Sequence, residues 1–563
     1  MRLSELGESL VRVIGVFMLG LSVRKPFASA SGLSLAVFAS ALVLAFAVFA
    51  PFGVPQAFAA ELEAATVVPG GADFDNPVND LMKHSFAKPA KGSVTWDAKT
   101  KTVTMKNATI NLDKQGSDEK TCAIFVSGKE VDPTPTVTLK LVGTNTITGT
   151  GKNLVAGVFV EEADLKIVGT GSLNIQMPAQ SLGVYAGDNL NAASGKVTVT
   201  GSRNGIFCDD AFTLSGAKIS LKNTASTALI ANEDAVFKKG SLTVKGVKAG
   251  HGILVDDGFA LSGATVNISG VSEKETVLVN EAAKVTAGTM TLSNGSVGIS
   301  CSKSFTLNGS KAKVSINSMK STGLVAKGVV CKAGTLSAKN CKYGIYSKSA
   351  VQITGGKVNI SKASETGIYA EGGKIQITGG AASVQCASAD KYALYSDKGI
   401  STKPTCLKSM KGAMTKGASF KVGGSTYQVN NGTSNVTLKA FAPSKKTSKV
   451  TVDTVTFGGW GYAVNAIGAG AFNTKQGAAV TSLTLGQRVA SVDANAFSNT
   501  KKLTKMTVKR ASSSKWKLNK KAFAQCGKNS GKGLTVKAAS SADAKKLKRL
   551  FVKAGMSAKA TFK

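Results

Sequence analysis

Acidic residues recur at regular intervals between residues 160 and 285, and their carboxylates are the groups in this chain best placed to do chemistry. They follow a short apolar phrase and are Glu161, Glu162, Asp188, Asp209, Asp210, Glu233, Asp256, Asp257 and Glu281. Aligned on the first small residue of each phrase, Asp209, Asp256 and Glu281 share one position, and Asp210 and Asp257 share the next. If each phrase is a strand in a stack, equivalent carboxylates lie about 4.8 Å apart, and repulsion at that distance raises pKa values or attracts a cation. The spacing predicts an acidic edge that would accept Ca2+, which tolerates irregular shells of oxygen ligands and can bridge to an acidic sugar.

A purely structural role explains the same residues without any ligand. Asp, Asn and Glu are ordinary turn residues whose side chains bond their own backbone. Both interpretations place these residues at corners of a repeated unit, so the repeat itself has to be established.

One phrase recurs along the chain: a small residue, a branched apolar residue and a further apolar or aromatic residue. It reads GVFVEEA at Gly157, GIFCDDA at Gly205, GILVDDG at Gly252 and GIYAEGG at Gly367. Successive copies lie about 21 to 26 residues apart, a period typical of stacked repeat architectures.

Each repeat contains three short strand signals. After GIFCDD come AFTLSG and AKISLK, where apolar Phe212 and Leu214, then Ile219 and Leu221, alternate with polar residues. Three strands with three turns make one coil of a three-sided solenoid, and a stack of about eleven or twelve coils buries the inner faces. The pattern predicts an all-β fold, a right-handed parallel β-helix over residues 92–405, because parallel crossover connections are right-handed by default.

Two other architectures fit less well. A leucine-rich horseshoe would show a fixed leucine-asparagine ladder, which residues 120–400 lack, and an antiparallel sandwich would not repeat its phrase so regularly.

At the start of the predicted β-helix, the segment GSVTWDAKTKTVTMKNATINL indicates two strands around a turn. The phrases VTLKLVGTNTIT and LKIVGTGSLNI, with the GIY-type coil starts, resemble surface β-helix domains of Gram-positive-type bacteria that are commonly classed as carbohydrate-binding. That resemblance covers residues 90–400 and implies the fold and a polysaccharide partner.

An enzymatic alternative follows from the same fold, because many β-helices cleave acidic polysaccharides. Cys208-Asp209-Asp210 and Gly250-His251-Gly252 resemble fragments of polygalacturonase-type motifs. That chemistry needs carboxylates framing one sugar bond, whereas these fragments lie two coils apart. We therefore expect no catalysis, and we expect His251 to be a turn residue.

Past residue 405 the pattern changes. Residues 406–460 form a β-rich connector, and residues 461–563 carry the phrases IGAGAF, VDANAF and LNKKAF, which end at Phe472, Phe497 and Phe523. An apolar strand follows each phrase, and the whole resembles the BspA-type leucine-rich repeat of bacterial surface proteins. The end, ADAKKLKRLFVKAGM, has helical spacing and predicts a capping helix.

Charge is concentrated in this last third. The chain has a net charge of +37. Residues 401–563 hold about 30 Lys and Arg against three acids. Such a field favours anionic partners, and we expect anionic wall polymers rather than nucleic acid, since stacking aromatics and a nucleic-acid motif are missing.

Residues 1–60 are predicted to be a signal peptide or an N-terminal anchor, followed by a leader linker over residues 61–91. Basic residues precede a long apolar run, and Ala57-Phe58-Ala59 offers the small residues of a cleavage site. Either outcome places the rest outside the cell, as a secreted or surface protein, and membrane contact is expected only if the segment stays uncleaved.

The remaining chemistry is sparse. The two histidines, His84 and His251, leave little room for a histidine triad or a histidine-rich metal site. Most of the eight cysteines are expected to be small core residues, with Cys386 and Cys406 as the one pair to test for a disulfide. The sequence thus favours a non-catalytic glycan-binding or adhesion protein that contacts host or wall components. A polysaccharide lyase or hydrolase and a ligand-free spacer are the alternatives.

Overall fold

The computed structural model describes residues 82–114, 122–128, 133–430, 434–531 and 533–563. Within this part, 36 strands, from β1 (Lys83–Phe86) to β36 (Ala413–Met414), form one continuous hydrogen-bonded network. The predicted signal or anchor segment, residues 1–60, lies outside the described residues. No helix in the described ranges is long and apolar enough to cross a membrane.

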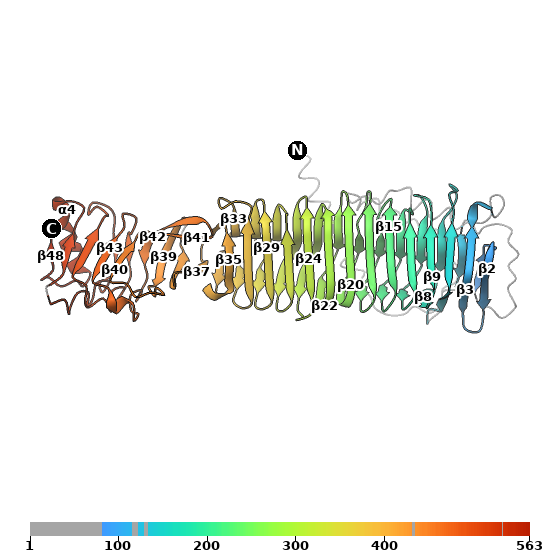
Figure 1. The fold of residues 1–563 in the computed structure, drawn as a ribbon, viewed down its shortest axis with the longest axis horizontal. Helices are drawn as coiled ribbons and strands as arrows, with labels where there is room; N and C mark the ends of the chain where they lie inside the picture. The colour runs from blue at the N-terminus through green and yellow to red at the C-terminus, as the bar shows by residue number, and fades with distance from the viewer. Residues whose placement is uncertain (1–81, 115–121, 129–132, 431–433, 532) are drawn as a thin grey trace, which may run out of the picture. The chain divides into compact units, whose positions relative to one another are not determined.

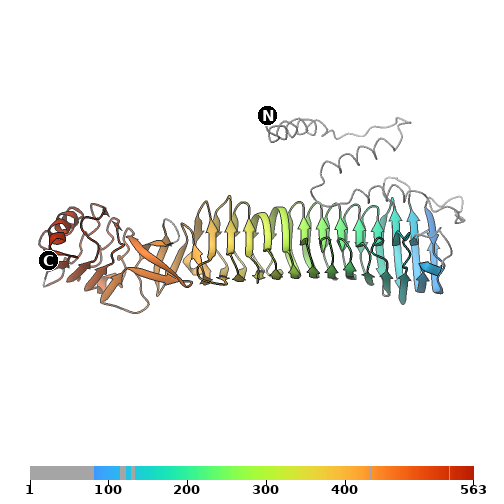
Figure 2. The same cartoon turned by 90° about the horizontal axis from the view of Figure 1, so that it is seen from above.

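The strands stack in three parallel ladders, which confirms the predicted parallel β-helix (Figure 1). The first face consists of β4 (Cys122–Ser127), β7 (Ala156–Glu161), β10 (Leu182–Ala186), β13 (Asn204–Cys208), β16 (Leu229–Ala231), β19 (Ile253–Val255), β21 (Glu275–Val279), β23 (Val297–Leu307), β25 (Thr322–Cys331), β27 (Tyr343–Ser347), β30 (Thr366–Ala370), β33 (Tyr392–Ser396) and β36. The second face includes β8 (Asp164–Gly169), β11 (Leu190–Ala192), β14 (Phe212–Leu214) and β17 (Ala235–Phe237), and the third includes β9 (Ser172–Gln176), β12 (Lys196–Thr200), β15 (Lys218–Thr224) and β18 (Ser241–Val247). Turned by 90°, the stack shows the same regular repetition of strands (Figure 2).

The core is built from columns of like side chains. On the first face Val184, Ile206, Leu229 and Ile253 are aligned in successive coils, and all are buried. Each such aliphatic side chain contributes about 1.5–3 kcal/mol when it leaves water. Because every second residue points inward, the strands keep the period-two alternation seen in the sequence.

The corner between the third and first faces requires a left-handed backbone. Asn223 (φ 53), Gly246 (φ 73), Gly270 (φ 71) and Asn294 (φ 55) occupy it in successive coils. Asn and Gly adopt this conformation at least cost, so the recurring Asn and Gly residues have a local steric reason.

Both ends of the stack differ from its middle. At the start, β2 (Lys91–Asp97) and β3 (Thr102–Asn111) pair antiparallel, as the sequence predicted. At the other end, β35 (Leu407–Lys411) and β36 continue the third and first faces. The stack therefore extends to Met414, past the boundary expected at residue 405.

The C-terminal part contains two further sheets. β39 (Asn435–Ala440), β42 (Trp460–Ile467), β44 (Ser491–Val492) and β46 (Lys517–Leu518) are parallel neighbours, and β40 (Lys449–Val452), β43 (Ser482–Leu485), β45 (Lys505–Val508), β47 (Thr535–Lys537) and β48 (Thr561–Phe562) form the second ladder. The phenylalanines of the repeated phrase stack in the core, with ring centroids 5.1 Å apart for Phe472–Phe497 and 5.4 Å apart for Phe497–Phe523. Phe441 extends this stack by one earlier copy, 4.6 Å from Phe472, which the sequence reading missed.

The predicted capping helix is α4 (Ser541–Lys553). The Ser540 hydroxyl accepts a hydrogen bond from the Asp543 N–H at 3.2 Å, which satisfies one of the free amides at the helix start. Phe551 packs on Phe523 with centroids 4.3 Å apart, so the helix covers the end of the phenylalanine stack.

The one cysteine pair that the sequence offered for a disulfide test, Cys386 with Cys406, is not bonded. All eight cysteines are free thiols, and all but Cys122 are buried, in keeping with their expected core role. Cys386 ends β32 (Ala381–Cys386), whereas Cys406 precedes β35, and Ala382 is paired with Leu407. The two cysteines therefore lie at opposite ends of paired strands, roughly 17 Å apart, too far for a disulfide.

Candidate functional site

The acidic residues gather where the first face turns into the second. Ala186, Cys208, Ala231, Val255 and Val279 are aligned at the ends of their strands. One residue later stands the inner column: Gly187, Asp209, Asn232, Asp256 and Asn280. Two residues later stands the outer column: Asp188, Asp210, Glu233, Asp257 and Glu281.

Two details of the predicted ladder are corrected by this register. Glu281 belongs to the outer column and Asn280 to the inner one, because Val255 is paired with Val279 and the phrase therefore starts at Thr276. Glu161 and Glu162 stand in a corner with one more residue than the corners that follow, and Glu162 takes a left-handed conformation (φ 49). These two glutamates therefore precede the regular row rather than belonging to it.

The inner column is a ladder of paired side chains. Asn232 Nδ2 donates to Asp209 Oδ1 at 3.3 Å, and Asn280 Nδ2 donates to Asp256 Oδ1 at 2.7 Å, each from the next coil. The Tyr185 hydroxyl donates to the other Asp209 oxygen. This column matches the structural interpretation of the aspartates, because its carboxylates already have protein donors.

Burial sets the electrostatics of the inner aspartates. It raises the pKa of Asp209 from 3.8 to about 6, the Tyr185 hydrogen bond opposes the shift, and the charges of Asp210 and Asp188 add to it. Burial also raises the pKa of Asp256, which the Asn280 hydrogen bond lowers and Asp257 raises. The inner carboxylates are thus harder to ionise than free aspartate.

The outer column faces solvent. Glu233 and Asp257 are exposed, and Asp188, Asp210 and Glu281 are half-buried. Desolvation, then Asp210 and Asp257, raises the pKa of Glu233, so neighbouring carboxylates in this row repel one another. The row ends where Lys303 forms an ion pair with Glu281.

The described residues contain no group of three or more His, Cys, Asp or Glu side chains disposed to hold one metal ion. Ca2+ at this edge therefore remains an expectation from the sequence.

An outward-facing column of mainly apolar side chains lies directly beside the acidic corner, on the outside of the first face, and Phe125, Phe159 and Phe207 in it are half-exposed whereas Tyr185 is buried. Phe125, Phe159, Tyr185 and Phe207 are aligned, with centroids 5.9, 4.4 and 5.7 Å apart in that order. The column continues through Ile230, Leu254, Leu278, Ser300 and Val325. An apolar strip next to a row of carboxylates is a surface on which a sugar ring could pack, with hydrogen-bond acceptors beside it.

The same column ends in tyrosines that the sequence reading did not single out. Tyr346, Tyr369 and Tyr395 take the outward position in three consecutive coils. The signal was present in the phrases GIYSKSA, GIYAEGG and ALYSDKG, where tyrosine occupies the third position each time.

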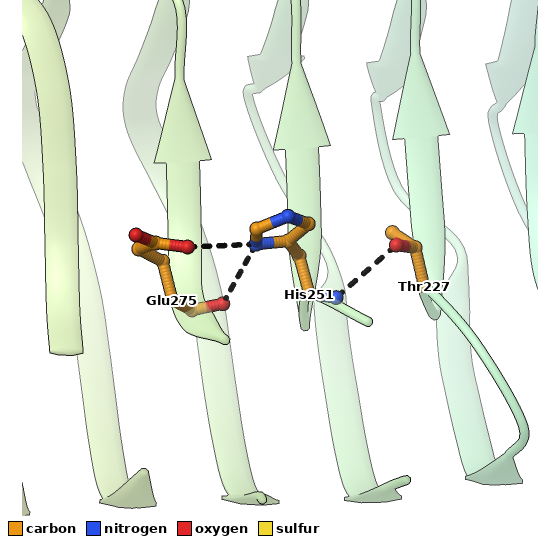
Figure 3. Close-up of polar contacts among 3 residues, drawn as sticks. All are labelled: Thr227, His251 and Glu275. Atoms are coloured by element: carbon orange, nitrogen blue, oxygen red, sulfur yellow. Dashed lines mark hydrogen bonds and ion pairs between the residues drawn. The ribbon is translucent and has the colours of Figure 1, made fainter. Parts of the chain in front are cut away.

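His251 belongs to the opposite end of the first-face strands (Figure 3). The backbone N–H of His251 donates to Thr227 Oγ1 at 3.1 Å, and the ring Nδ1 of His251 lies 3.3 Å from Glu275 Oε2. Burial lowers the pKa of His251, the carboxylate and carbonyl of Glu275 oppose this, and Lys274 adds to it. These contacts join three successive coils, in keeping with a turn residue.

The two motif fragments with an enzymatic resemblance are not brought together. Asp209 follows the end of β13, while His251 precedes the start of β19, and β16 lies between those strands. The structure therefore holds them at different ends of the face and two coils apart.

A comparison with known families identifies one match. The model of a family described as "Carbohydrate-binding domain-containing protein" matches residues 89–246 and 222–392, which together span more than half of the chain and include the acidic corner. No curated protein and no solved structure matches the chain.

Proposed function

Because the chain belongs to the family of carbohydrate-binding domain-containing proteins, we propose that it is a non-catalytic glycan-binding protein, secreted or held at the cell surface. The observation that carries the proposal is the outward column of the first face, in which half-exposed Phe159, Phe207 and Leu254 run beside the outer row of carboxylates. Sugar rings have apolar C–H faces that pack on such side chains, and their hydroxyls donate to carboxylates. A stack of similar coils presents an outward side chain at the same position in each coil, as binding of an elongated polysaccharide requires.

The absence of catalysis is part of the proposal. Glycoside cleavage uses an acid and a second carboxylate poised on either side of one sugar bond. Asp209 and Asp256, the inner aspartates whose pKa values are raised, are instead engaged by Tyr185 and by amides of the next coil. We therefore assign them to the scaffold.

The enzymatic alternative is tested by incubating the protein with pectin-like polymers and Ca2+ and measuring product release. Product from the wild type that is lost in Asp209→Ala and Asp256→Ala would establish a lyase or hydrolase. No product from any of the three supports binding without cleavage.

For the C-terminal part we propose a leucine-rich-repeat module of BspA type that holds anionic polymers. Its support is the stacked Ala-Phe repeat and the exposed lysines of successive turns, Lys501, Lys502, Lys520 and Lys521. On α4, Lys545, Lys546, Lys548 and Arg549 are also exposed. Clustered cations of this kind bind polyanions in a salt-dependent manner. Adhesion to wall or host components would follow from the two binding parts together.

The electrostatic part is tested with the full chain on a polyphosphate resin. Replacing Lys501, Lys502, Lys520 and Lys521 by Glu should lower the salt concentration for elution. Replacing the exposed β-helix lysines Lys284, Lys313, Lys332 and Lys357 is the matched control and should lower it less. Equal shifts would show that net charge, not the module, governs retention.

Glycan binding itself is tested by applying the full chain to an array of neutral and acidic polysaccharides. Binding to at least one class is expected. A blank array with folded protein would favour a ligand-free spacer.

A further inference from the structure

Five tyrosines lie together near the end of the first face. Tyr346, Tyr369 and Tyr395 are aligned outward on β27, β30 and β33, and Tyr343 and Tyr392 start the first and last of these strands. The whole chain has 8 tyrosines, so most of them are concentrated in three adjacent coils. We call these five residues the tyrosine platform.

The rings of the tyrosine platform meet edge to face. Centroids are 5.2 Å apart for Tyr346–Tyr369, 5.0 Å for Tyr369–Tyr395 and 4.9 Å for Tyr392–Tyr395, with interplanar angles of 87°, 89° and 83°. All five residues are only half-buried, unlike the wholly buried phenylalanines of the core. Aromatic surface is therefore left in water at a position where each ring is already fixed by its neighbours.

Polar groups at the platform are oriented by the same coils. The Tyr343 hydroxyl donates to Glu365 Oε2 at 2.8 Å, and the Tyr346 hydroxyl donates to Glu371 Oε2 at 2.5 Å. Lys342 pairs with Glu365 at 3.3 Å, so that carboxylate is compensated. Glu371 instead accepts its hydrogen bond from the Tyr346 phenol.

Carboxylates lie near the two central rings, those of Tyr369 and Tyr395. Burial raises the pKa of Tyr369 and of Tyr395, and the charge of Asp397 raises both further, with Glu371 adding to the effect on Tyr369. The phenols thus stay protonated and serve as hydrogen-bond donors at neutral pH, beside carboxylates that serve as acceptors. At these two rings Asp397 and Glu371 would repel a carboxylate on a ligand, whereas the Lys342 ammonium lies 5.6 Å from the centre of the Tyr343 ring.

We propose that the tyrosine platform is a subsite for neutral, hydroxyl-bearing pyranose chains. Ring C–H faces would pack on Tyr369 and Tyr395, and hydroxyls would bond to Glu371, Asp397 and the phenols. The aligned positions repeat from coil to coil, so successive sugar units of a linear polymer would lie along successive tyrosines of the platform. This inference rests on the proposed glycan-binding function and names one place and one ligand class for it.

The test is isothermal titration of the full chain with soluble β-glucan and galactomannan as neutral probes and pectate as the acidic probe. Tyr369→Ala with Tyr395→Ala should weaken binding of a neutral probe by about tenfold or more, through lost aromatic contact. Tyr369→Phe with Tyr395→Phe keeps both rings and should weaken it less. Val330→Ala, an outward, half-buried apolar residue on the second face, is the matched control and should leave the affinity for that probe within about twofold. Circular dichroism establishes that each variant is folded.

Each outcome separates this inference from the broader one. Neutral glycan bound equally by wild type and a folded double-alanine variant would overturn the platform and leave glycan binding standing. Binding of pectate alone would do the same. Binding of no glycan at all would overturn both.

Discussion

Asn280 on one coil donates its side-chain amide to the Asp256 carboxylate of the preceding coil at 2.7 Å. The contact crosses between strands that are 24 residues apart in the chain, and Asn232 with Asp209 repeats it two coils earlier. The corner beside the first face is therefore held by amide–carboxylate rungs, while Glu233 and Asp257 of the outer column are exposed to solvent.

Removing one rung should loosen the corner locally. Asn280→Ala leaves Asp256 without its amide donor, at a cost of about 1 kcal/mol. Hydrogen exchange measured by mass spectrometry should become faster in peptides covering residues 253–283. Asn359→Ala, which removes an exposed amide on the third face, should leave that region unchanged. Unchanged exchange in the Asn280 variant would mean that the backbone ladder alone fixes the corner.

Asp209 should make stability depend on pH. Its pKa is about 6 in the folded chain, against 3.8 ordinarily. Between these values the folded state binds more protons at this site than the unfolded state, so the contribution of Asp209 to stability is fully present below about pH 4 and is lost as the pH rises to about 6. Asp209→Asn should reduce this pH-dependent loss in the free energy of unfolding by about 1–2 kcal/mol. The midpoint of urea unfolding should then depend less steeply on pH.

The control for that titration is Asp257→Asn, which removes one charge from the exposed outer column. It should leave most of the pH dependence in place. A pH profile equally flattened by both substitutions would assign the effect to net charge in the row rather than to burial of Asp209.

His251 should titrate below its ordinary pKa of 6.5, because burial disfavours the imidazolium. A lowered pKa means that the unfolded state takes up the proton first, so this residue's contribution to stability is present above about pH 6.5 and is lost as the pH falls. NMR of the imidazole protons measures the midpoint, with His84 as the only other histidine. Glu275→Gln should lower the midpoint further and Lys274→Ala should raise it, and a midpoint above 6.5 in the wild type would contradict the account.

The C-terminal phenylalanine stack should be essential for that part of the chain. Phe497 is fully buried between Phe472 and Phe523, so Phe497→Ala should cost about 3–5 kcal/mol. Limited proteolysis should then cleave residues 434–563 while the β-helix resists. Phe562→Ala, at a partly exposed ring, should have a much smaller effect. Cleavage spread evenly over both parts would show that they unfold together.

Much of the architecture could be predicted because its signals are local. Alternation within a strand and the spacing of the repeated phrase appear in any single coil, and both describe the observed strands from β7 to β33. The register between coils was harder to predict from the sequence. The copy that starts at Thr276 lacks the usual small residue, so the sequence alignment placed Glu281 one column away from its observed position.

The sequence alone determined a parallel stack of short strands with buried apolar columns, a second repeat built on Ala-Phe, and a capping helix. These features depend on residue type and on period, which every repeat carries within itself. Only the tertiary structure decided that Asp209 and Asp256 are engaged by neighbouring coils, that Cys386 and Cys406 lie apart, and that five tyrosines form one surface. The physical reason is that such contacts join residues on different coils. One residue more or less at a corner moves a side chain to another column.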